Sequence, residues 1–150
     1  MKNKEKILII DDDEGICKTL SLILENEGYS VETANTGKEA LEKSKTKTYN
    51  VALLDIRLPD IEGTKLLKAL PEGTPRMIKI MVTGYPQLGN AVEALNLGAD
   101  AYLMKPVYPG DLIKTIEEKL EAQKKAETMT EEKIAVFLEA RTQKLLEDLG

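Results

Sequence analysis

The fold is decided by one stretch, Val51-Ala52-Leu53-Leu54-Asp55-Ile56-Arg57-Leu58-Pro59-Asp60, in which a short apolar run stops at a carboxylate and then turns at a proline. The four apolar residues are too few for a helix and have no polar face, so they predict a strand covered on both sides, typical of a parallel sheet. Open α/β sheets bind their ligands outside the carboxyl ends of the strands, so Asp55 should face a cleft. The chemistry of the protein is therefore expected at this edge of the sheet.

Strand patterns and amphipathic helix patterns alternate along most of the chain. The predicted strands are residues 7–10, 29–34, 50–55, 79–83 and 101–104, and the predicted helices are residues 14–27, a short helix opened by the capping box Thr36-Gly37-Lys38-Glu39, and residues 64–70, 87–97 and 112–121. Gly28 and Gly98 are expected to end two of the helices in a left-handed conformation. Five alternations with short connections predict an α/β fold, a doubly wound sandwich whose parallel sheet is wrapped by helices on both faces.

The composition becomes polar after Glu121, so residues 1–121 are predicted to form one domain and residues 122–150 a linker followed by an amphipathic helix. The stretch from Gln123 to Thr128 has no apolar periodicity, which indicates a linker or a solvated helix. Thr130 could cap a new helix. One face of that helix would carry Ile134, Phe137, Leu138, Leu145 and Leu149, interrupted by Arg141. This face must be covered, either by folding back on the domain or by the same helix of a second copy.

Composition excludes several classes of protein. The 150 residues, of which 42% are apolar, suit one domain, and the net charge of -5 without a basic stripe argues against direct binding of nucleic acid. No signal-peptide segment and no apolar run of membrane-spanning length is present. The single cysteine, Cys17, fits a reducing cytoplasm and lies at helical spacing among apolar residues, which predicts a packing role. The absence of histidine removes hydrolase triads and most metal-enzyme ligand sets.

Polar groups follow four of the predicted strands: Asp11 and Asp12 the first, Asp55 the third, Thr83 the fourth and Lys105 the fifth. An acidic run after a strand is usually a set of helix-capping residues. Here, however, carboxylates converge from two strands, and two like charges about 4 Å apart repel by roughly 4 kcal/mol at an effective dielectric constant of 20. A cation should therefore lie among them, and ligands that are all oxygen suit Mg²⁺.

A pocket with this balance of charge also suits a phosphoryl group, which brings about two negative charges and three acceptor oxygens. Asp55 can then act as an in-line nucleophile. The metal, Lys105 and the hydroxyl of Thr83 would stabilise the phosphoryl oxygens.

Several motifs at the strand ends resemble one known family. They are Ile-Asp-Asp-Asp-Glu at 10–14, L-L-D-I-R-L-P-D-I-E-G at 53–63, M-V-T-G at 81–84 and G-A-D-A-Y-L-M-K-P-V at 98–107. From Lys4 to about Leu120 the chain resembles the receiver domain of two-component response regulators. The resemblance implies a flavodoxin-like fold with strand order 2-1-3-4-5.

The resemblance also implies a role for each site residue. Asp55 would accept a phosphoryl group, in trans, from a histidine kinase or a phosphotransfer protein. Mg²⁺ or Mn²⁺ would be bound by Asp12 and Asp55, by the backbone carbonyl of Arg57, and by Asp11 largely through water.

Three further residues are assigned by the resemblance. Lys105 would contact the phosphoryl group, Thr83 would turn inward to it, and Tyr102 would occupy the space that Thr83 vacates. The Lys105–Pro106 bond is often cis in this family. The protein would thus be a cytoplasmic signalling switch, not an enzyme with a separate substrate, and would catalyse only its own phosphorylation and dephosphorylation.

The chain departs from the family pattern at a few positions. Tyr108 stands where an aspartate commonly precedes the proline that opens the fifth helix, so a loose helix start is expected, partly compensated by Asp111. Arg57 and Tyr85 occupy positions that vary widely among family members and should tune the lifetime of the phosphoryl group.

Two alternatives remain open. The D-x-D within Asp11–Asp13 also fits a phosphatase of the haloacid dehalogenase type, but that reading leaves Asp55 idle and lacks the later acidic pair for Mg²⁺. The closer alternative is the N-terminal receiver of a longer transcriptional or enzymatic regulator, because the short tail cannot form a helix-turn-helix unit with its own core. A receiver without an output domain must signal through association or a partner surface, so a homodimer is the favoured arrangement of the tail.

Overall fold

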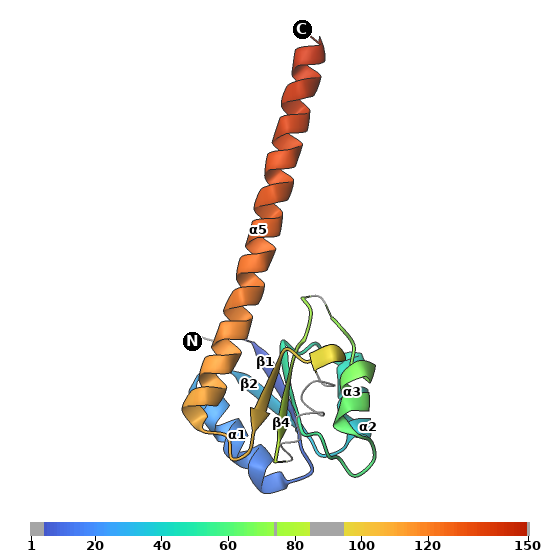
Figure 1. Cartoon of the computed structure of the whole chain (residues 1–150), viewed down its shortest axis with the longest axis vertical. Coiled ribbons are helices and arrows are strands. Elements are labelled where there is room, and N and C mark those ends of the chain that lie inside the picture. Colours follow the sequence, from blue (N-terminus) through green and yellow to red (C-terminus); the bar gives the residue numbers. More distant parts are fainter. Residues whose placement is uncertain (1–4, 74, 85–94, 150) are drawn as a thin grey trace. The chain divides into compact units, whose positions relative to one another are not determined.

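The computed structural model describes residues 5–73, 75–84 and 95–149 of the chain (Figure 1). The strands are β1 (Lys6–Ile10), β2 (Ser30–Ala34), β3 (Val51–Leu54), β4 (Ile78–Thr83) and β5 (Ala101–Met104), and the helices are α1 (Glu14–Asn26), α2 (Gly37–Thr46), α3 (Gly63–Ala69) and α5 (Pro109–Leu149). These elements agree with the predicted ones to within a few residues, except at α5. The helix predicted at 87–97 lies largely outside the described residues.

The five strands form one parallel sheet in the order β2-β1-β3-β4-β5, as predicted. Strand β1 pairs with both β2 and β3, so that Ile10 lies beside Ala34 on one side and Leu54 on the other. All residues of β3 and β4 are buried, which explains why both strands are largely apolar without alternation, with Lys79 and Thr83 as the polar residues of β4. Parallel pairing brings the carboxyl ends of all five strands to the same edge of the sheet.

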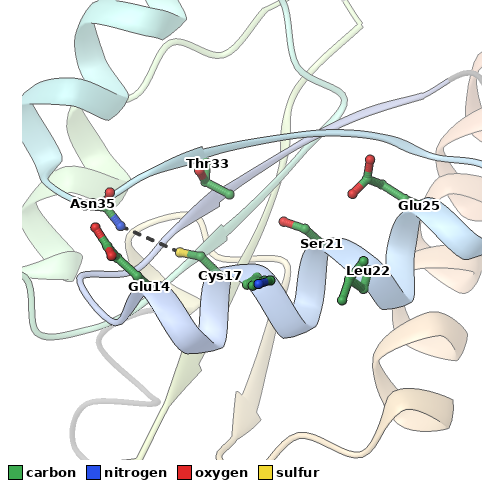
Figure 2. Close-up of a pocket in the computed structure, with 8 residues that line it drawn as sticks. Glu14, Cys17, Ser21, Leu22, Glu25, Thr33 and Asn35 are labelled. Carbon is green, nitrogen blue, oxygen red and sulfur yellow. Dashed lines mark hydrogen bonds between the residues drawn. The ribbon is translucent and has the colours of Figure 1, made fainter.

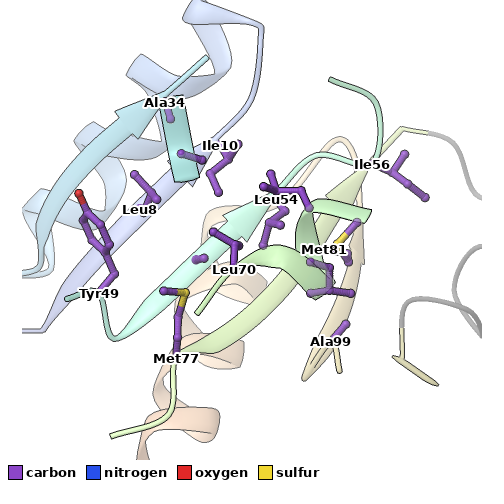
Figure 3. Packing of buried hydrophobic residues seen from close by; sticks show 14 residues of the cluster. Leu8, Ile10, Ala34, Tyr49, Leu54, Ile56, Leu70, Met77, Met81 and Ala99 are labelled. Carbon is purple, nitrogen blue, oxygen red and sulfur yellow. The ribbon is translucent and has the colours of Figure 1, made fainter. Parts of the chain in front are cut away.

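Side chains alternate between the two faces of the sheet, and helices cover both faces. Leu8, Ile10 and Leu54 point to the face covered by α2 and α3, where they join Tyr49, Leu70 and Met81 in one buried cluster (Figure 3). The other face carries the alternate residues of the strands and is covered by α1 and the start of α5 (Figure 1). The core is therefore a helix–sheet–helix sandwich, which holds the strand ends rigidly.

Local sequence signals set the helix ends. The carboxylate of Asp13 accepts a hydrogen bond from the Ile16 amide at 3.1 Å and caps α1, while the hydroxyl of Thr36 accepts one from the Glu39 amide at 3.1 Å and caps α2. Gly28 and Gly98 have φ angles of 96° and 106°, the left-handed conformation predicted for both. Of the three consecutive aspartates, Asp13 is thus the capping residue.

Lys79 is a charged residue inside the buried strand β4, and its side chain is 4% exposed. Its ammonium donates hydrogen bonds to the backbone carbonyls of Leu67 at 3.2 Å and Leu70 at 3.3 Å, which are left without helical partners at the end of α3. The long apolar stem crosses the core while the charge neutralises the negative end of the helix. Lys79 therefore fixes the end of α3 to the sheet.

The tail is one continuous helix, so the solvated-helix alternative for the polar stretch is the one found, and the separate helix start predicted at Thr130 is wrong. Helix α5 runs without a break from Pro109 to Leu149, so the polar stretch from Gln123 to Thr128 is helical, and no new helix begins at Thr130. The hydroxyl of Thr130 instead donates to the Ala126 carbonyl at 2.9 Å, the bond of a residue inside a helix. Pro109 occupies the first helical position, where its missing amide costs nothing, so the helix also starts earlier than predicted.

The chain divides into two compact units, residues 1–116 and residues 117–150. In the second unit the side chains of Ile134, Phe137, Leu138, Leu145 and Leu149 are each more than half exposed. The guanidinium of Arg141 lies 5.9 Å from the centre of the Phe137 ring, so it stacks on the apolar stripe that it interrupts. Among the described helices, none is both long and apolar enough to cross a membrane.

Candidate functional site

Backbone hydrogen bonds that continue the sheet position the polar residues at its carboxyl edge. The Asp11 amide donates to the Ala34 carbonyl at 3.0 Å, the Asp55 amide to the Ile10 carbonyl at 2.9 Å, and the Lys105 amide to the Thr83 carbonyl at 2.8 Å. In each case the amide of the site residue donates to a carbonyl of the neighbouring strand, so the sheet pairing continues one residue past the end of the strand. The predicted convergence of Asp11, Asp55, Thr83 and Lys105 at one edge follows directly from this pairing.

Lys105 bridges two buried carboxylates. Its Nζ lies 2.7 Å from Oδ2 of Asp11 and 3.1 Å from Oδ2 of Asp55, and these aspartates are only 4% and 7% exposed. The second oxygen of Asp11 accepts from the Asp13 amide at 2.9 Å, and that of Asp55 accepts from the Arg57 amide at 3.2 Å. Every carboxylate oxygen of the buried pair thus has a donor, as burial of charge requires.

The surroundings shift the pKa of two of these groups. Burial raises the pKa of Asp55, assisted by the charge of Asp11 and opposed by the Arg57 amide and by Lys105. Burial by itself would lower the pKa of Lys105, but its bonds to Asp11 and Asp55 outweigh burial, so the pKa of Lys105 is raised. The Lys105 amine is therefore firmly protonated. It lies beside the Asp55 carboxylate, whose ionised form is disfavoured by burial.

Oxygens of Asp11, Asp12 and Asp55 all lie within 4.8 Å of one another. Asp11 and Asp55 are buried, whereas Asp12 is exposed and can reach the ion from the solvent side. Carboxylate ligands without nitrogen or sulfur suit a hard divalent cation that keeps part of its water shell. The residues present therefore fit Mg²⁺ or Mn²⁺.

The 56–62 loop, which follows Asp55, folds back tightly on the site. The Gly63 amide donates to the Ile56 carbonyl at 2.7 Å, and Arg57 and Glu62 form an antiparallel bridge. A Cβ atom on Gly63 would lie 2.3 Å from the Asp55 carbonyl oxygen, so only glycine allows this approach. The return of the chain fixes the backbone of Arg57 beside the carboxylate of Asp55.

The family model for the response regulator receiver domain matches residues 7–117, which hold the whole of this site. The chain belongs to this family. Receiver domains are signalling switches of two-component systems, so the resemblance and the fold stated above are both confirmed.

Similar proteins agree with the assignment. The transcriptional regulatory protein ZraR of Klebsiella oxytoca is 37% identical over 132 residues, which cover 87% of this chain and 30% of ZraR. The cell cycle response regulator CtrA of Brucella ovis is 32% identical over 111 residues, covering 74% of this chain and 48% of CtrA. The crystal structure of a CheY-like receiver domain protein from Methanospirillum hungatei JF-1 is 52% identical, with a TM-score of 0.78, and covers 83% of this chain and 99% of that one. The chain thus spans less than half of these two longer regulators.

Other features that the receiver resemblance implied can be located in the structure. The Lys105–Pro106 bond is cis. Thr83 is fully buried at the end of β4, and Tyr102, partly buried, pairs with Met81 and packs against the core. The proposed movements of Thr83 and Tyr102 stay predictions, and Tyr85 lies outside the described residues.

Two residues near the site were missed in the sequence. The side-chain amide of Asn35, after β2, donates to the Asp11 carbonyl at 3.0 Å and steadies the first acidic residue. Asp60, at the tip of the 56–62 loop, accepts hydrogen bonds from the Gly37 and Lys38 amides, both at 2.9 Å. A polar residue after an edge strand and an aspartate in a turn are weak signals, because both are common without any special partner.

Two hollows adjoin α1. A shallow one of about 400 Å³ is lined by residues of α1 and β2, among them Cys17, Ser21 and Asn35 (Figure 2). Cys17 is buried there, its thiol donates to the Asp11 carbonyl at 3.3 Å, and burial raises its pKa to about 11, which fits the predicted packing role. The second hollow, of about 640 Å³, is an apolar groove that reaches Lys105 and is lined by Ile16, Thr19, Leu20, Pro106 and Val107 among others.

Asp55→Asn should raise the free energy of unfolding of the metal-free protein near neutral pH. A carboxyl group whose folded-state pKa lies above its unfolded value of about 3.9 destabilises the fold when it is ionised. Below the unfolded pKa the group is protonated in both states and the penalty vanishes. Urea denaturation in EDTA should therefore show an advantage of the variant that grows as the pH rises from about 4 to about 7. A variant less stable than the wild type at neutral pH would mean that the pairing with Lys105 outweighs burial.

Proposed function

We propose that this receiver accepts a phosphoryl group on Asp55, in trans, from a phosphohistidine of a histidine kinase or phosphotransfer protein, and acts as a cytoplasmic switch. The observation that carries the proposal is the buried Asp11–Lys105–Asp55 arrangement at the carboxyl edge of the sheet. In the transfer, the bond between phosphorus and the donor imidazole breaks while a bond to a carboxylate oxygen of Asp55 forms. The imidazole leaves and takes up a proton from water.

Each residue of the site would have a separate role in the transfer. Lys105, 3.1 Å from Asp55, would exchange part of its contact with that carboxylate for the phosphoryl oxygens. Mg²⁺ or Mn²⁺, held by Asp11, Asp12, Asp55 and the Arg57 carbonyl, would supply positive charge to the transferred group. The site would thus catalyse only the phosphorylation of Asp55 and the later loss of that phosphoryl group to water. Thr83 would turn toward the phosphoryl group and Tyr102 would follow it, which would carry the signal to β5 at the edge of the sheet.

A small phosphodonor such as acetyl phosphate, with Mg²⁺, should label the protein once, and the label should be absent from Asp55→Asn. An aspartate beside a bound metal needs no separate enzyme for this transfer. Intact-mass spectrometry at pH and temperature that preserve acyl phosphates measures the added group. The matched control is Asp148→Asn, which changes an exposed aspartate of the tail, outside the charge cluster, and should still be labelled. Labelling that persists in Asp55→Asn would refute the assignment.

The donor protein would contact the apolar groove between the start of α1 and the segment after β5. The groove reaches Lys105, so a protein that presents an imidazole to Asp55 from outside the strand ends must cover it. Thr19 is exposed in the groove, whereas Ser21 lines the hollow beside β2. These two residues offer a matched pair of positions on one helix.

Thr19→Arg should slow phosphotransfer from a kinase that labels the wild type, by about tenfold or more, while leaving labelling by acetyl phosphate unchanged. A charged, bulky side chain in an apolar contact costs binding energy, about 1.4 kcal/mol for each factor of ten. Transfer of ³²P from the purified autophosphorylated kinase measures the effect. Ser21→Arg, with the same change of charge on the same helix, should transfer normally. Equal rates for Thr19→Arg and the wild type would place the donor elsewhere.

A second copy of the chain is proposed to cover the apolar face of the tail, formed by Ile134, Phe137, Leu138, Leu145 and Leu149. Burial of one large apolar side chain contributes roughly 1.5–3 kcal/mol, so pairing of two such faces would stabilise a helix that is marginal alone. The division into a receiver of residues 1–121 and a tail of residues 122–150 is part of this proposal. Because ZraR and CtrA are longer proteins, the same tail could also lead into an output domain of a transcriptional regulator.

Truncation after Glu121 should reduce the solution mass from that of a dimer to that of a monomer without affecting phosphorylation. The double variant Leu138→Lys/Leu145→Lys should do the same, because two charges on the covered face prevent pairing. Val136 is exposed on the other side of the helix, so Val136→Lys is the matched control and should stay dimeric. Light scattering measures the mass. A full-length protein that is monomeric at high concentration would contradict the dimer.

A further inference from the structure

The tip of the 56–62 loop is fastened to the start of α2. Both carboxylate oxygens of Asp60 are used: Oδ1 accepts from the Gly37 amide and Oδ2 from the Lys38 amide, each at 2.9 Å. These amides belong to the first turn of α2, where backbone donors have no helical partners and a negative charge is favoured. The two bonds lower the pKa of Asp60, so the carboxylate stays charged near neutral pH.

Ile61, the residue after Asp60, makes a second contact between the 56–62 loop and α2. A Cβ atom on Gly37 would lie 2.1 Å from Cγ2 of Ile61, and Ile61 packs partly buried against the core. Any side chain larger than hydrogen at residue 37 would therefore displace the loop. Polar bonds from Asp60 and the close contact of Ile61 together hold the loop tip against α2.

The base of the same loop reaches the charge cluster. Arg57, whose amide donates to the Asp55 carboxylate, is bridged to Glu62 across the loop, and Gly63 returns to the Ile56 carbonyl. Only two residues, Leu58 and Pro59, separate Arg57 from Asp60, and the bridge across the loop leaves little slack between them. A displacement of the tip would thus be passed to the backbone of Arg57.

We infer that Asp60 is a positioning residue for the metal site: by clamping the loop to α2, it sets where the Arg57 backbone meets the cation bound by Asp55. Asp60 makes no contact with the cation itself and acts only through the loop. The inference rests on the proposed function in that the cation is the one assigned to the Asp11–Asp12–Asp55 cluster. The inference adds that a displacement of α2 would be transmitted through the loop to the metal site.

Mg²⁺ binding to the full chain, measured by isothermal titration calorimetry, tests the inference. Asp60→Ala should weaken Mg²⁺ binding by at least roughly threefold, less than the about 10–100-fold lost when a direct outer-shell partner is removed. Amide hydrogen exchange at Gly37 and Lys38 should speed up in the same variant. Asp60→Asn, which keeps one acceptor oxygen, should fall between the wild type and Asp60→Ala in both measurements.

Two matched controls separate positioning from simpler effects. Glu62→Ala removes a negative charge from the same loop, but the Glu62 side chain makes no capping bond, so Mg²⁺ affinity should stay within about twofold of the wild type. Thr36→Ala removes the capping bond to the Glu39 amide and weakens α2 without releasing the loop, so affinity should likewise be retained. Gly37→Ala, which pushes on Ile61, should weaken binding as Asp60→Ala does.

Wild-type affinity in Asp60→Ala would overturn the inference, and so would a loss in Thr36→Ala equal to that in Asp60→Ala. Unchanged exchange at Gly37 and Lys38 in Asp60→Ala would overturn it as well, because the clamp would then be absent in solution. These results leave the proposed function standing, since the wild type still binds Mg²⁺ and Asp12→Ala still abolishes the binding. A wild-type chain that binds no Mg²⁺ would contradict both.

Discussion

The site depends on one constraint, the repulsion between carboxylates that a parallel sheet forces together at its edge. Asp11 and Asp55 follow adjacent strands, and their burial makes the repulsion too strong to leave unbalanced. Lys105 balances it from the fifth strand, with its ammonium within 3.1 Å of both carboxylates. The cluster already contains carboxylates and an ammonium group. A cation fits there because it pairs with the carboxylates, and a phosphoryl group fits because it pairs with the ammonium and the cation.

The fold could be predicted from the sequence because its signals are local and repeated. The apolar run from Val51 to Leu54 and the other strand patterns define a parallel sheet, and polar residues at the ends of four of the strands mark the site. Parallel pairing then places Asp11, Asp55, Thr83 and Lys105 at one edge without further information. The functional assignment of these residues needed the resemblance to receiver domains, since strand-end carboxylates serve many reactions.

Other features could not be predicted, because they depend on partners far away in the sequence. In the sequence, a lysine within a buried strand has no evident partner. The structure shows that the Lys79 ammonium donates to backbone carbonyls at the end of α3. Asp60 reads as an ordinary turn residue, because nothing in the loop reveals that its carboxylate meets α2. The polar stretch from Gln123 to Thr128 has no apolar stripe, so the pattern of hydrophobic residues could not tell a linker from a solvated helix.

The central claim is that Asp55, and no other aspartate of the cluster, carries the phosphoryl group. The most direct measurement reduces the phosphorylated protein with borohydride, which converts an acyl phosphate to a stable alcohol, and locates the modified residue by peptide mass spectrometry. The account predicts a single modification, at Asp55. Modification at Asp11, Asp12 or Asp13 would contradict it and would favour a phosphatase that uses the first strand end.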